Sequence, residues 1–178
     1  MSERFRMTAA EFRELPETNT PVELIEGEIV TTPTPVYSHQ QTVFTTAKWI
    51  DANARNGVTV ISPMDVYLDE QTVLQPDIFW VSDNSKSCRL QEGYWYGAPD
   101  LVVEVLSPST AVKDRGVKFD LYEQHGVREY WLVDPLGRFI EVWMLQQGRF
   151  TQLGAYEAEF TSPILGDKAV SLQGLFDL

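Results

Sequence analysis

The chain has 178 residues, 43% of them hydrophobic and 22% charged, a composition typical of one folded domain with an ordinary hydrophobic core. Its 26 acidic and 14 basic residues give a formal net charge of −12, which argues against a high-affinity, non-specific binder of nucleic acid. A lone cysteine excludes an internal disulfide, and no apolar run approaches the roughly 18 residues of a membrane span. Because the first six residues also lack the apolar segment of a signal peptide, we expect a cytoplasmic protein without membrane contacts.

The first third of the chain predicts two helices and a hairpin. A capping-box pattern that begins at Thr8 predicts a short helix ending before Pro16. Residues 21–30 combine β-branched residues with a central glycine, which favours a hairpin or a bent strand. A second capping-box pattern begins at Ser38 and precedes apolar residues at helical spacing, so we expect a second helix that ends near Gly57.

The middle of the chain predicts three short strands, over residues 58–67, 73–81 and 100–106, each rich in aliphatic or aromatic residues. The segment 82–99 is longer than a connection requires and predicts a loop, and long loops often carry function. It contains the aromatic run Tyr94-Trp95-Tyr96, which would either stack on bases or form a dimer contact. The acidic net charge favours the dimer contact.

The last part of the chain predicts a third helix and further strands. Residues 110–125 have a helical pattern that ends at Gly126, a residue type common just after a helix. Strands are expected over residues 129–133, 138–145 and 149–156, and the tail after residue 161 is expected to be partly strand. Because no repeat or linker divides the chain, residues 1–178 are expected to form one α/β domain.

Acidic side chains carry the chemistry that this sequence supports. The chain has no glycine-rich phosphate loop, no His-Glu-x-x-His pair and no G-x-S-x-G turn, and one cysteine cannot build a thiolate zinc site. Glu104 lies inside an otherwise apolar strand, where an ionised acid is costly unless it is paired or binds a metal. Asp77 opens another apolar strand. If these strands are neighbours with the two acids aligned, the pair would favour an oxygen-coordinated cation such as Mg²⁺ or Mn²⁺.

One face of the predicted third helix gathers ionisable and apolar side chains. At about 100° per residue, this face contains Asp114, Lys118, Leu121, Tyr122 and His125. An ammonium group at Lys118 would reach a carboxylate site on the sheet, whereas a solvated lysine would lie on the opposite face. The alternative is that Asp114 and Lys118 form an ordinary surface pair worth about a few tenths of a kcal/mol.

The other candidate residues also have purely structural interpretations. Asp77 would be an ordinary strand-start residue after a proline, and Glu104 would be a structural ion-pair partner. His39 would only begin its helix, and His125 would only stabilise the end of another helix. A site role stays open for both histidines.

Several motifs together resemble a known family. They are Pro76-Asp77, the run Gly97-Ala98-Pro99-Asp100-Leu101-Val102-Val103-Glu104-Val105-Leu106-Ser107-Pro108-Ser109-Thr110, the residues Asp114, Lys118 and Tyr122, and the run Gly126-Val127-Arg128-Glu129-Tyr130-Trp131-Leu132-Val133-Asp134-Pro135. The segment Glu23-Leu24-Ile25-Glu26-Gly27-Glu28 and the Ser38-His39 helix start fit the same pattern. Over nearly its whole length the chain resembles a family of predicted endonucleases that is abundant in cyanobacteria and belongs to the PD-(D/E)XK restriction-endonuclease-like superfamily.

This resemblance implies a restriction-endonuclease-like central mixed β-sheet flanked by helices in αβββαβ order, with additional β-hairpins. It implies that Asp77 and Glu104 bind a divalent metal, with the backbone carbonyl of Val105 as a further ligand. A superfamily lysine that positions the nucleophile or stabilises negative charge is expected two residues after Glu104, where this chain has a leucine. Lys118 from the following helix is expected to replace it, and Glu23 is expected as an additional ligand.

The leading hypothesis is therefore a Mg²⁺- or Mn²⁺-dependent endonuclease that cleaves nucleic acid, with DNA as the expected substrate. A homodimer is expected, because many relatives of this fold cleave two strands with two subunits. A second hypothesis is a non-catalytic protein that keeps the fold for binding or scaffolding, which the acidic charge favours. A third is action on a small phosphorylated substrate or nucleotide, because such a substrate tolerates a net charge of −12 better than duplex DNA does.

Overall fold

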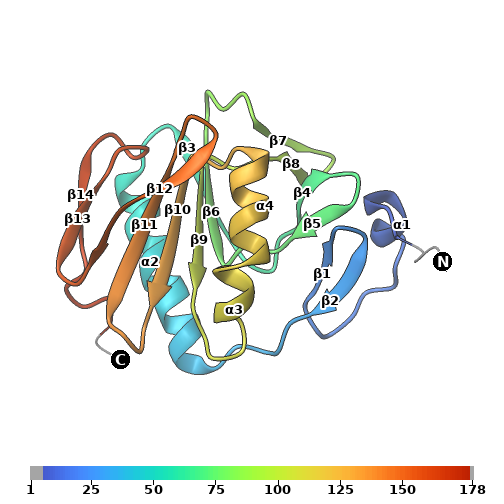
Figure 1. The fold of residues 1–178 in the computed structure, drawn as a ribbon, viewed down its shortest axis with the longest axis horizontal. Coiled ribbons are helices and arrows are strands. Elements are labelled where there is room, and N and C mark those ends of the chain that lie inside the picture. Colours follow the sequence, from blue (N-terminus) through green and yellow to red (C-terminus); the bar gives the residue numbers. More distant parts are fainter. Residues whose placement is uncertain (1–5, 177–178) are drawn as a thin grey trace.

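The computed structural model describes residues 6–176 and has a central β-sheet with helices on both faces (Figure 1). Residues 1–5 and 177–178 lie outside the described residues. The sequence-based expectation about a signal peptide concerns the first residues, most of which are not described. The two ends of the predicted 1–178 domain are not described either. Within residues 6–176, no helix is both long enough and apolar enough to span a bilayer.

The described residues form mostly short strands and a few helices. The helices are α1 (Ala9–Arg13), α2 (Tyr37–Asn53), α3 (Ala111–Asp114) and α4 (Val117–His125). The strands are β1 (Val22–Ile25), β2 (Glu28–Thr31), β3 (Gly57–Ile61), β4 (Val66–Asp69), β5 (Thr72–Leu74), β6 (Ile78–Ser82), β7 (Cys88–Gln91), β8 (Tyr94–Gly97), β9 (Leu101–Val105), β10 (Glu129–Asp134), β11 (Phe139–Gln146), β12 (Arg149–Tyr156), β13 (Glu159–Ser162) and β14 (Lys168–Ser171).

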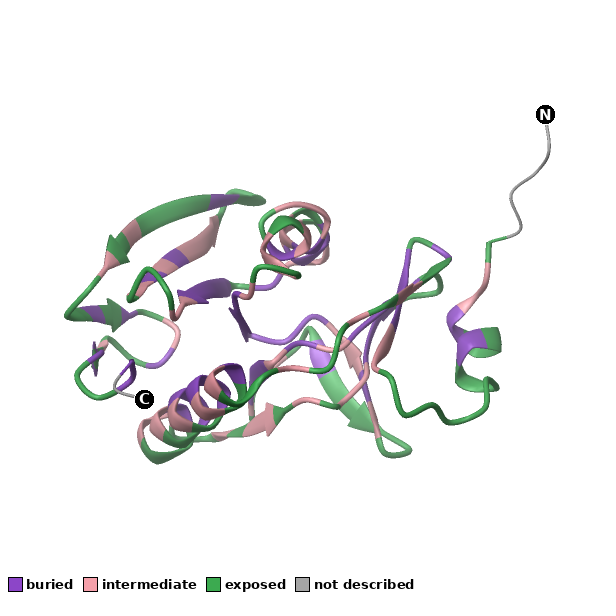
Figure 2. Ribbon diagram, turned by 90° about the horizontal axis from the view of Figure 1, so that it is seen from below, coloured by how far each residue is buried: buried purple, intermediate pink, exposed green. Residues whose placement is uncertain are grey.

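The central sheet contains strands in the order β12-β11-β10-β9-β6-β3. Strands β9 and β10 run parallel, and the other neighbours run antiparallel, so the sheet is mixed. In chain order, α2, β3, β6, β9, the α3–α4 pair and β10 form the predicted αβββαβ succession. Figure 1 shows α2 and α4 on opposite faces of this sheet, and Figure 2 shows the same layers from below.

Alternating side chains along β9 explain why both faces of the sheet are covered. Val103 and Val105 contribute to a core that includes residues of α2. Val102 contributes to the opposite core, which includes Tyr122 of α4. Because successive side chains of a strand point to opposite faces, Glu104 lies on the α4 side of the sheet with Val102.

A second sheet, in the order β2-β1-β5-β4-β8-β7, lies beside the central one (Figure 1). It joins the α4-side core through Trp95, whose ring meets Phe79 of β6 edge-on at 5.7 Å between centroids. Helix α1 packs on this sheet through Phe12 and Tyr67. The β13–β14 hairpin extends the α2-side core through Phe160.

The starts of the first two helices had the same sequence signature but differ in structure. The capping box of α1 is confirmed, because the Thr8 hydroxyl accepts from the Glu11 N–H and the Glu11 carboxylate accepts from the Thr8 N–H. The prediction of a capping box at Ser38 is wrong. The N-cap residue of helix α2 is Val36, two residues before Ser38, and it makes no side-chain hydrogen bond.

Prolines and a glycine divide three elements that were predicted to be continuous. The strand expected over residues 58–67 is β3 and β4, separated at Ser62-Pro63. The strand expected over residues 73–81 is β5 and β6, separated at Pro76, because proline has no N–H to donate within a sheet. The helix expected over residues 110–125 breaks at Gly116, whose φ of −116° and ψ of −107° are not helical.

The prediction of a loop over residues 82–99 is wrong, because this segment contains the β7–β8 hairpin. Its aromatic side chains pack within the monomer. Trp95 is buried, and Tyr94 and Tyr96 lie against Tyr67 with ring centroids 5.6 Å and 5.0 Å from it. The aromatic run therefore gives no support for a dimer contact or for base stacking, and homodimerisation stays a prediction.

Candidate active site

The pairing of β6 with β9 brings Asp77 and Glu104 together. The two strands are antiparallel, and Ile78 lies opposite Val103. Asp77 immediately precedes Ile78 and Glu104 immediately follows Val103, so the two acids occupy the next opposed positions at one end of the sheet. The Asp77 backbone N–H donates to Glu104 Oε2 at 3.3 Å.

Glu104 is buried, and its carboxylate receives three hydrogen bonds. Oε1 accepts from Lys118 Nζ at 2.9 Å and from the Tyr122 hydroxyl at 2.7 Å, while Oε2 accepts from the Asp77 N–H. Burial raises the pKa of Glu104 well above its ordinary value, and the charge of Lys118 opposes this increase. These three donors explain how an acid is accommodated in an apolar strand.

Helix α4 presents Lys118 to this carboxylate. Nζ of Lys118 lies 2.8 Å from Glu23 Oε1, 2.9 Å from Glu104 Oε1 and 4.0 Å from Asp114 Oδ1. Burial alone lowers the pKa of Lys118, but the charges of these three acids outweigh it and hold the pKa well above its ordinary value. Lys118 therefore carries a full positive charge inside the site.

Asp114 is buried beside Lys118 rather than exposed on a helix surface. Burial is the main cause that raises the pKa of Asp114 to about 6, and the charge of Lys118 opposes it. The interpretation of Asp114 and Lys118 as a solvated surface pair is wrong, because both side chains are buried.

Glu23 enters the site from β1 of the second sheet. Its Oε1 accepts from the Gln75 N–H at 2.9 Å as well as from Lys118, and its Oε2 lies 3.6 Å from Lys113 Nζ. The Lys113 ammonium also donates to Thr32 Oγ1 at 3.3 Å. Glu23 thus forms ion pairs with two lysines.

His39 reaches Asp77 from the first turn of α2. Its Nε2 lies 3.2 Å from Asp77 Oδ2, which also accepts the Val105 N–H at 2.8 Å. Burial lowers the pKa of His39, but the hydrogen bond and charge of Asp77, together with the Val105 backbone, outweigh burial and raise it. The Asp77 side chain is 17% exposed, so it is more accessible than Glu104.

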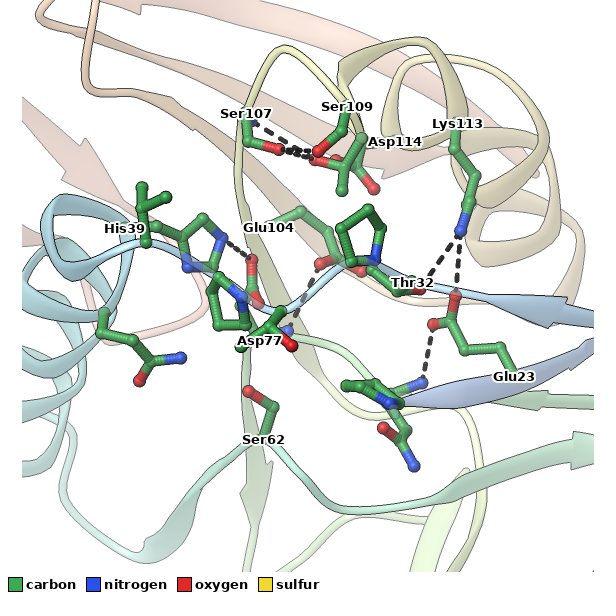
Figure 3. Close-up of a pocket in the computed structure, with 18 of the residues that line it drawn as sticks. Glu23, Thr32, His39, Ser62, Asp77, Glu104, Ser107, Ser109, Lys113 and Asp114 are labelled. Carbon is green, nitrogen blue, oxygen red and sulfur yellow. Dashed lines mark hydrogen bonds and ion pairs between the residues drawn. The ribbon is translucent and has the colours of Figure 1, made fainter. Parts of the chain in front are cut away.

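These residues surround one cavity of about 410 Å³ (Figure 3). Figure 3 shows His39 directed at Asp77 on one side and Lys113 directed at Thr32 and Glu23 on another. The charged residues that line the cavity are Glu23, Asp77, Glu104, Asp114, Lys113 and Lys118. The cavity therefore combines parts of both sheets with the starts of α2 and α4.

The structure brings together Asp77, Glu104, Lys118 and Glu23, the side chains that the sequence singled out. Val105 is also present, and its N–H bonds to Asp77. Sequence reasoning missed the contact of His39 with Asp77 and that of Tyr122 with Glu104, because both contacts join distant segments. His125 lies outside the cavity lining and pairs instead with Asp69, at 2.8 Å from Nε2 to Oδ2.

The oxygen donors of Asp77 and Glu104 fit a hard divalent cation, with one restriction. Within residues 6–176, no group of three or more His, Cys, Asp or Glu side chains is arranged to hold a metal ion. Mg²⁺ is usually bound by one or two carboxylates and keeps several of its waters, so two acids are enough protein ligands for it. Among the described residues, none donates a hydrogen bond to Asp77 Oδ1, which leaves that oxygen available.

Comparison with known proteins identifies the family. The model of the Uma2 family, described as "Putative restriction endonuclease", matches residues 9–170. The chain belongs to the Uma2 family. A crystal structure of "a putative nuclease belonging to DUF820" from Anabaena variabilis resembles this Uma2 chain with a TM-score of 0.78 and 24% identity, covering 96% of this chain and 98% of that one. The fold is therefore the restriction-endonuclease-like α/β fold with a central mixed sheet. No curated protein matches the Uma2 chain.

Proposed function

We propose that this chain is a divalent-metal-dependent endonuclease that hydrolyses phosphodiester bonds in nucleic acid, with DNA as the expected substrate. One observation carries the proposal: the opposed carboxylates of Asp77 and Glu104 lie at one end of the sheet beside the charged Lys118. The family description and the shared fold support the same class of reaction.

Asp77 and Glu104 would hold Mg²⁺ or Mn²⁺, with the Val105 carbonyl and water as further ligands. When bound, the ion would activate a water molecule and stabilise the negative charge that develops on the phosphodiester. Asp77 is suited to this role because it lines the cavity and its Oδ1 has no donor among the described residues. Glu104 is suited because Lys118 and Tyr122 hold its Oε1 and so fix the orientation of the carboxylate.

Lys118 would stabilise the negative charge of a bound phosphate from its place on α4. Its ammonium is held by Glu23 and Glu104, so the charge is already positioned before substrate binds. Glu23 supports this function as an anchor for Lys118, because its Oε1 contacts the ammonium directly. The role of Glu23 as an additional metal ligand stays a prediction.

The charge balance of the cavity also supports a divalent cation. Four carboxylates and two ammonium groups line it, so two negative charges would be left over if all four acids were ionised and His39 were neutral. Such an excess in a largely buried site disfavours ionisation of the acids. A doubly charged ion would neutralise this excess.

A second candidate function is non-catalytic binding or scaffolding. The observation that favours it is that Lys118 already contacts three acids, so the buried charges are stabilised without a metal. Under this alternative the protein would bind its partner without Mn²⁺ and would cleave no phosphodiester.

The experiment that separates the two functions is cleavage of single-stranded and duplex DNA by the purified chain with Mg²⁺, Mn²⁺ or EDTA. We expect cleavage only with the metals, and we expect Asp77→Asn and Glu104→Gln each to reduce the rate by more than about 100-fold, since losing a ligand costs more than losing a residue that supports one. Asp69→Asn is the matched control, because Asp69 bonds His125 outside the cavity lining. Absence of metal-dependent cleavage, with the fold intact by circular dichroism, would favour the scaffolding function.

A further inference from the structure

His39 makes a contact that helix packing alone does not require. It lies in the first turn of α2, its side chain is 10% exposed, and it lines the cavity beside Asp77. An ionised carboxylate can only accept hydrogen bonds, so the 3.2 Å contact between Nε2 and Asp77 Oδ2 requires the hydrogen to be on Nε2. This holds for the neutral ring with its hydrogen on Nε2 and for the cation alike.

The two oxygens of Asp77 have different surroundings. Oδ2 is contacted from two directions: it lies 3.2 Å from His39 Nε2 of α2 and accepts from the Val105 N–H of β9. Oδ1 receives no hydrogen bond from the described residues. These two contacts from different elements restrict both the position of Oδ2 and the rotation of the carboxylate, and therefore the direction of Oδ1.

The surroundings of the other ring nitrogen, Nδ1, argue against His39 as a general base. Nδ1 is buried and has no hydrogen-bond partner among the described residues. A general base must reach the proton that it removes, directly or through one water, and a buried Nδ1 does not. With Nε2 occupied by Asp77, His39 acts on the site through that carboxylate.

We propose that His39 is a positioning residue, which holds the Asp77 carboxylate so that Oδ1 is directed to the cation of the proposed active site. This inference rests on the proposed function. Residues that orient metal ligands through hydrogen bonds typically change metal affinity by about 10- to 100-fold when they are lost. Loss of His39 is therefore expected to weaken metal binding by that factor while the ligands themselves are retained.

The test is isothermal titration of Mn²⁺ into the full chain and three variants at position 39. The amide nitrogen of glutamine can take the place of Nε2, whereas that of asparagine reaches only the place of Nδ1. We expect His39→Gln to bind Mn²⁺ within a few-fold of the original chain, and His39→Asn and His39→Ala to bind it about 10- to 100-fold more weakly. A merely structural role for His39 predicts no such difference between the glutamine and asparagine variants.

His125→Ala is the matched control, because it removes a histidine that pairs with a carboxylate outside the cavity lining. Its Mn²⁺ affinity should equal that of the original chain, and thermal unfolding of every variant shows whether the fold is retained. Equal Mn²⁺ affinity for His39→Asn and His39→Gln overturns the positioning role and leaves the proposed function standing. No Mn²⁺ binding by the original chain overturns both.

Discussion

Lys118 is the residue on which the charge balance of the cavity depends. Its ammonium compensates Glu23, Glu104 and Asp114, which are all buried. Removing one partner from a buried ion pair leaves an uncompensated charge, whereas removing the whole pair does not. The lysine is therefore expected to affect stability as well as the proposed reaction.

Lys118→Met keeps the length of the side chain and removes its charge. We expect it to lower the free energy of unfolding by about 3–5 kcal/mol at pH 8, as for other broken buried pairs. The pKa of Glu104 is already raised, so acid can neutralise it, and the loss should be smaller at pH 5 than at pH 8. Urea denaturation at pH 5 and pH 8 measures this difference in the free energy of unfolding.

The control for Lys118→Met is the same change at Lys86, which is exposed. This variant should alter the free energy of unfolding by no more than about 0.5 kcal/mol. A Lys118→Met variant as stable as the original chain at both pH values would mean that the acids do not depend on the lysine.

Cys88 is the thiol of this chain, and it is buried. Burial raises its pKa to about 12 from 9.0, with a further contribution from the charge of Asp100. Because the folded pKa is raised, the stability that this neutral thiol contributes is fully present below about pH 9 and is lost as the pH rises toward about 12. We expect negligible reaction with a disulfide reagent at pH 8 in buffer and rapid reaction in urea, and fast labelling of the folded chain would contradict this.

At the scale of elements, a break at Gly116 separates α3 from α4. Gly116 has backbone angles that a helix does not allow, and a Cβ at this position would meet the Val112 carbonyl oxygen at 2.8 Å. Asp114 and Lys118 stay close together across this break, with 4.0 Å between Lys118 Nζ and Asp114 Oδ1, as their spacing of four residues would also allow in a continuous helix.

Gly116→Ala tests this element. We expect a loss of about 1–3 kcal/mol in the free energy of unfolding, because the added Cβ would lie 2.8 Å from the Val112 carbonyl oxygen and the backbone would have to shift. For a chain of this size, each 1 kcal/mol corresponds to about 2–4 °C in Tm, so calorimetry is sensitive enough to detect the loss. A variant with an unchanged or higher Tm would show that a straight helix is compatible with the fold.

At the scale of the whole molecule, a net charge of −12 limits how nucleic acid can bind. The cavity offers two ammonium groups, Lys113 and Lys118, and both already contact Glu23. Few phosphates can therefore be neutralised at this site. Homodimerisation, which would combine two sites, stays a prediction.

Binding of DNA should consequently depend weakly on salt. With at most two phosphates neutralised, the slope of log K against log salt concentration should be no steeper than about −2. Fluorescence anisotropy of labelled DNA with the Asp77→Asn variant, from 50 to 200 mM salt, measures the slope without cleavage. A slope of about −6 would reveal a basic surface that includes residues outside the cavity.

The sequence by itself determined the αβββαβ order, the two acids in apolar strands and the inward face of Lys118. Each of these depends on local patterns, since the periodicity of side chains decides which residues a strand or helix buries. Local signals also misled, because the spacing at Ser38 matches a capping box although the N-cap of the helix is Val36, two residues earlier.

Only the tertiary structure decided which residues meet. Strand register placed Asp77 opposite Glu104, the second sheet brought Glu23 to Lys118, and α2 brought His39 to Asp77. The same long-range packing buried Trp95, which the sequence placed in a loop. Such contacts join segments that are distant along the chain, and no local periodicity specifies them, because their free energy arises only when the packed layers form.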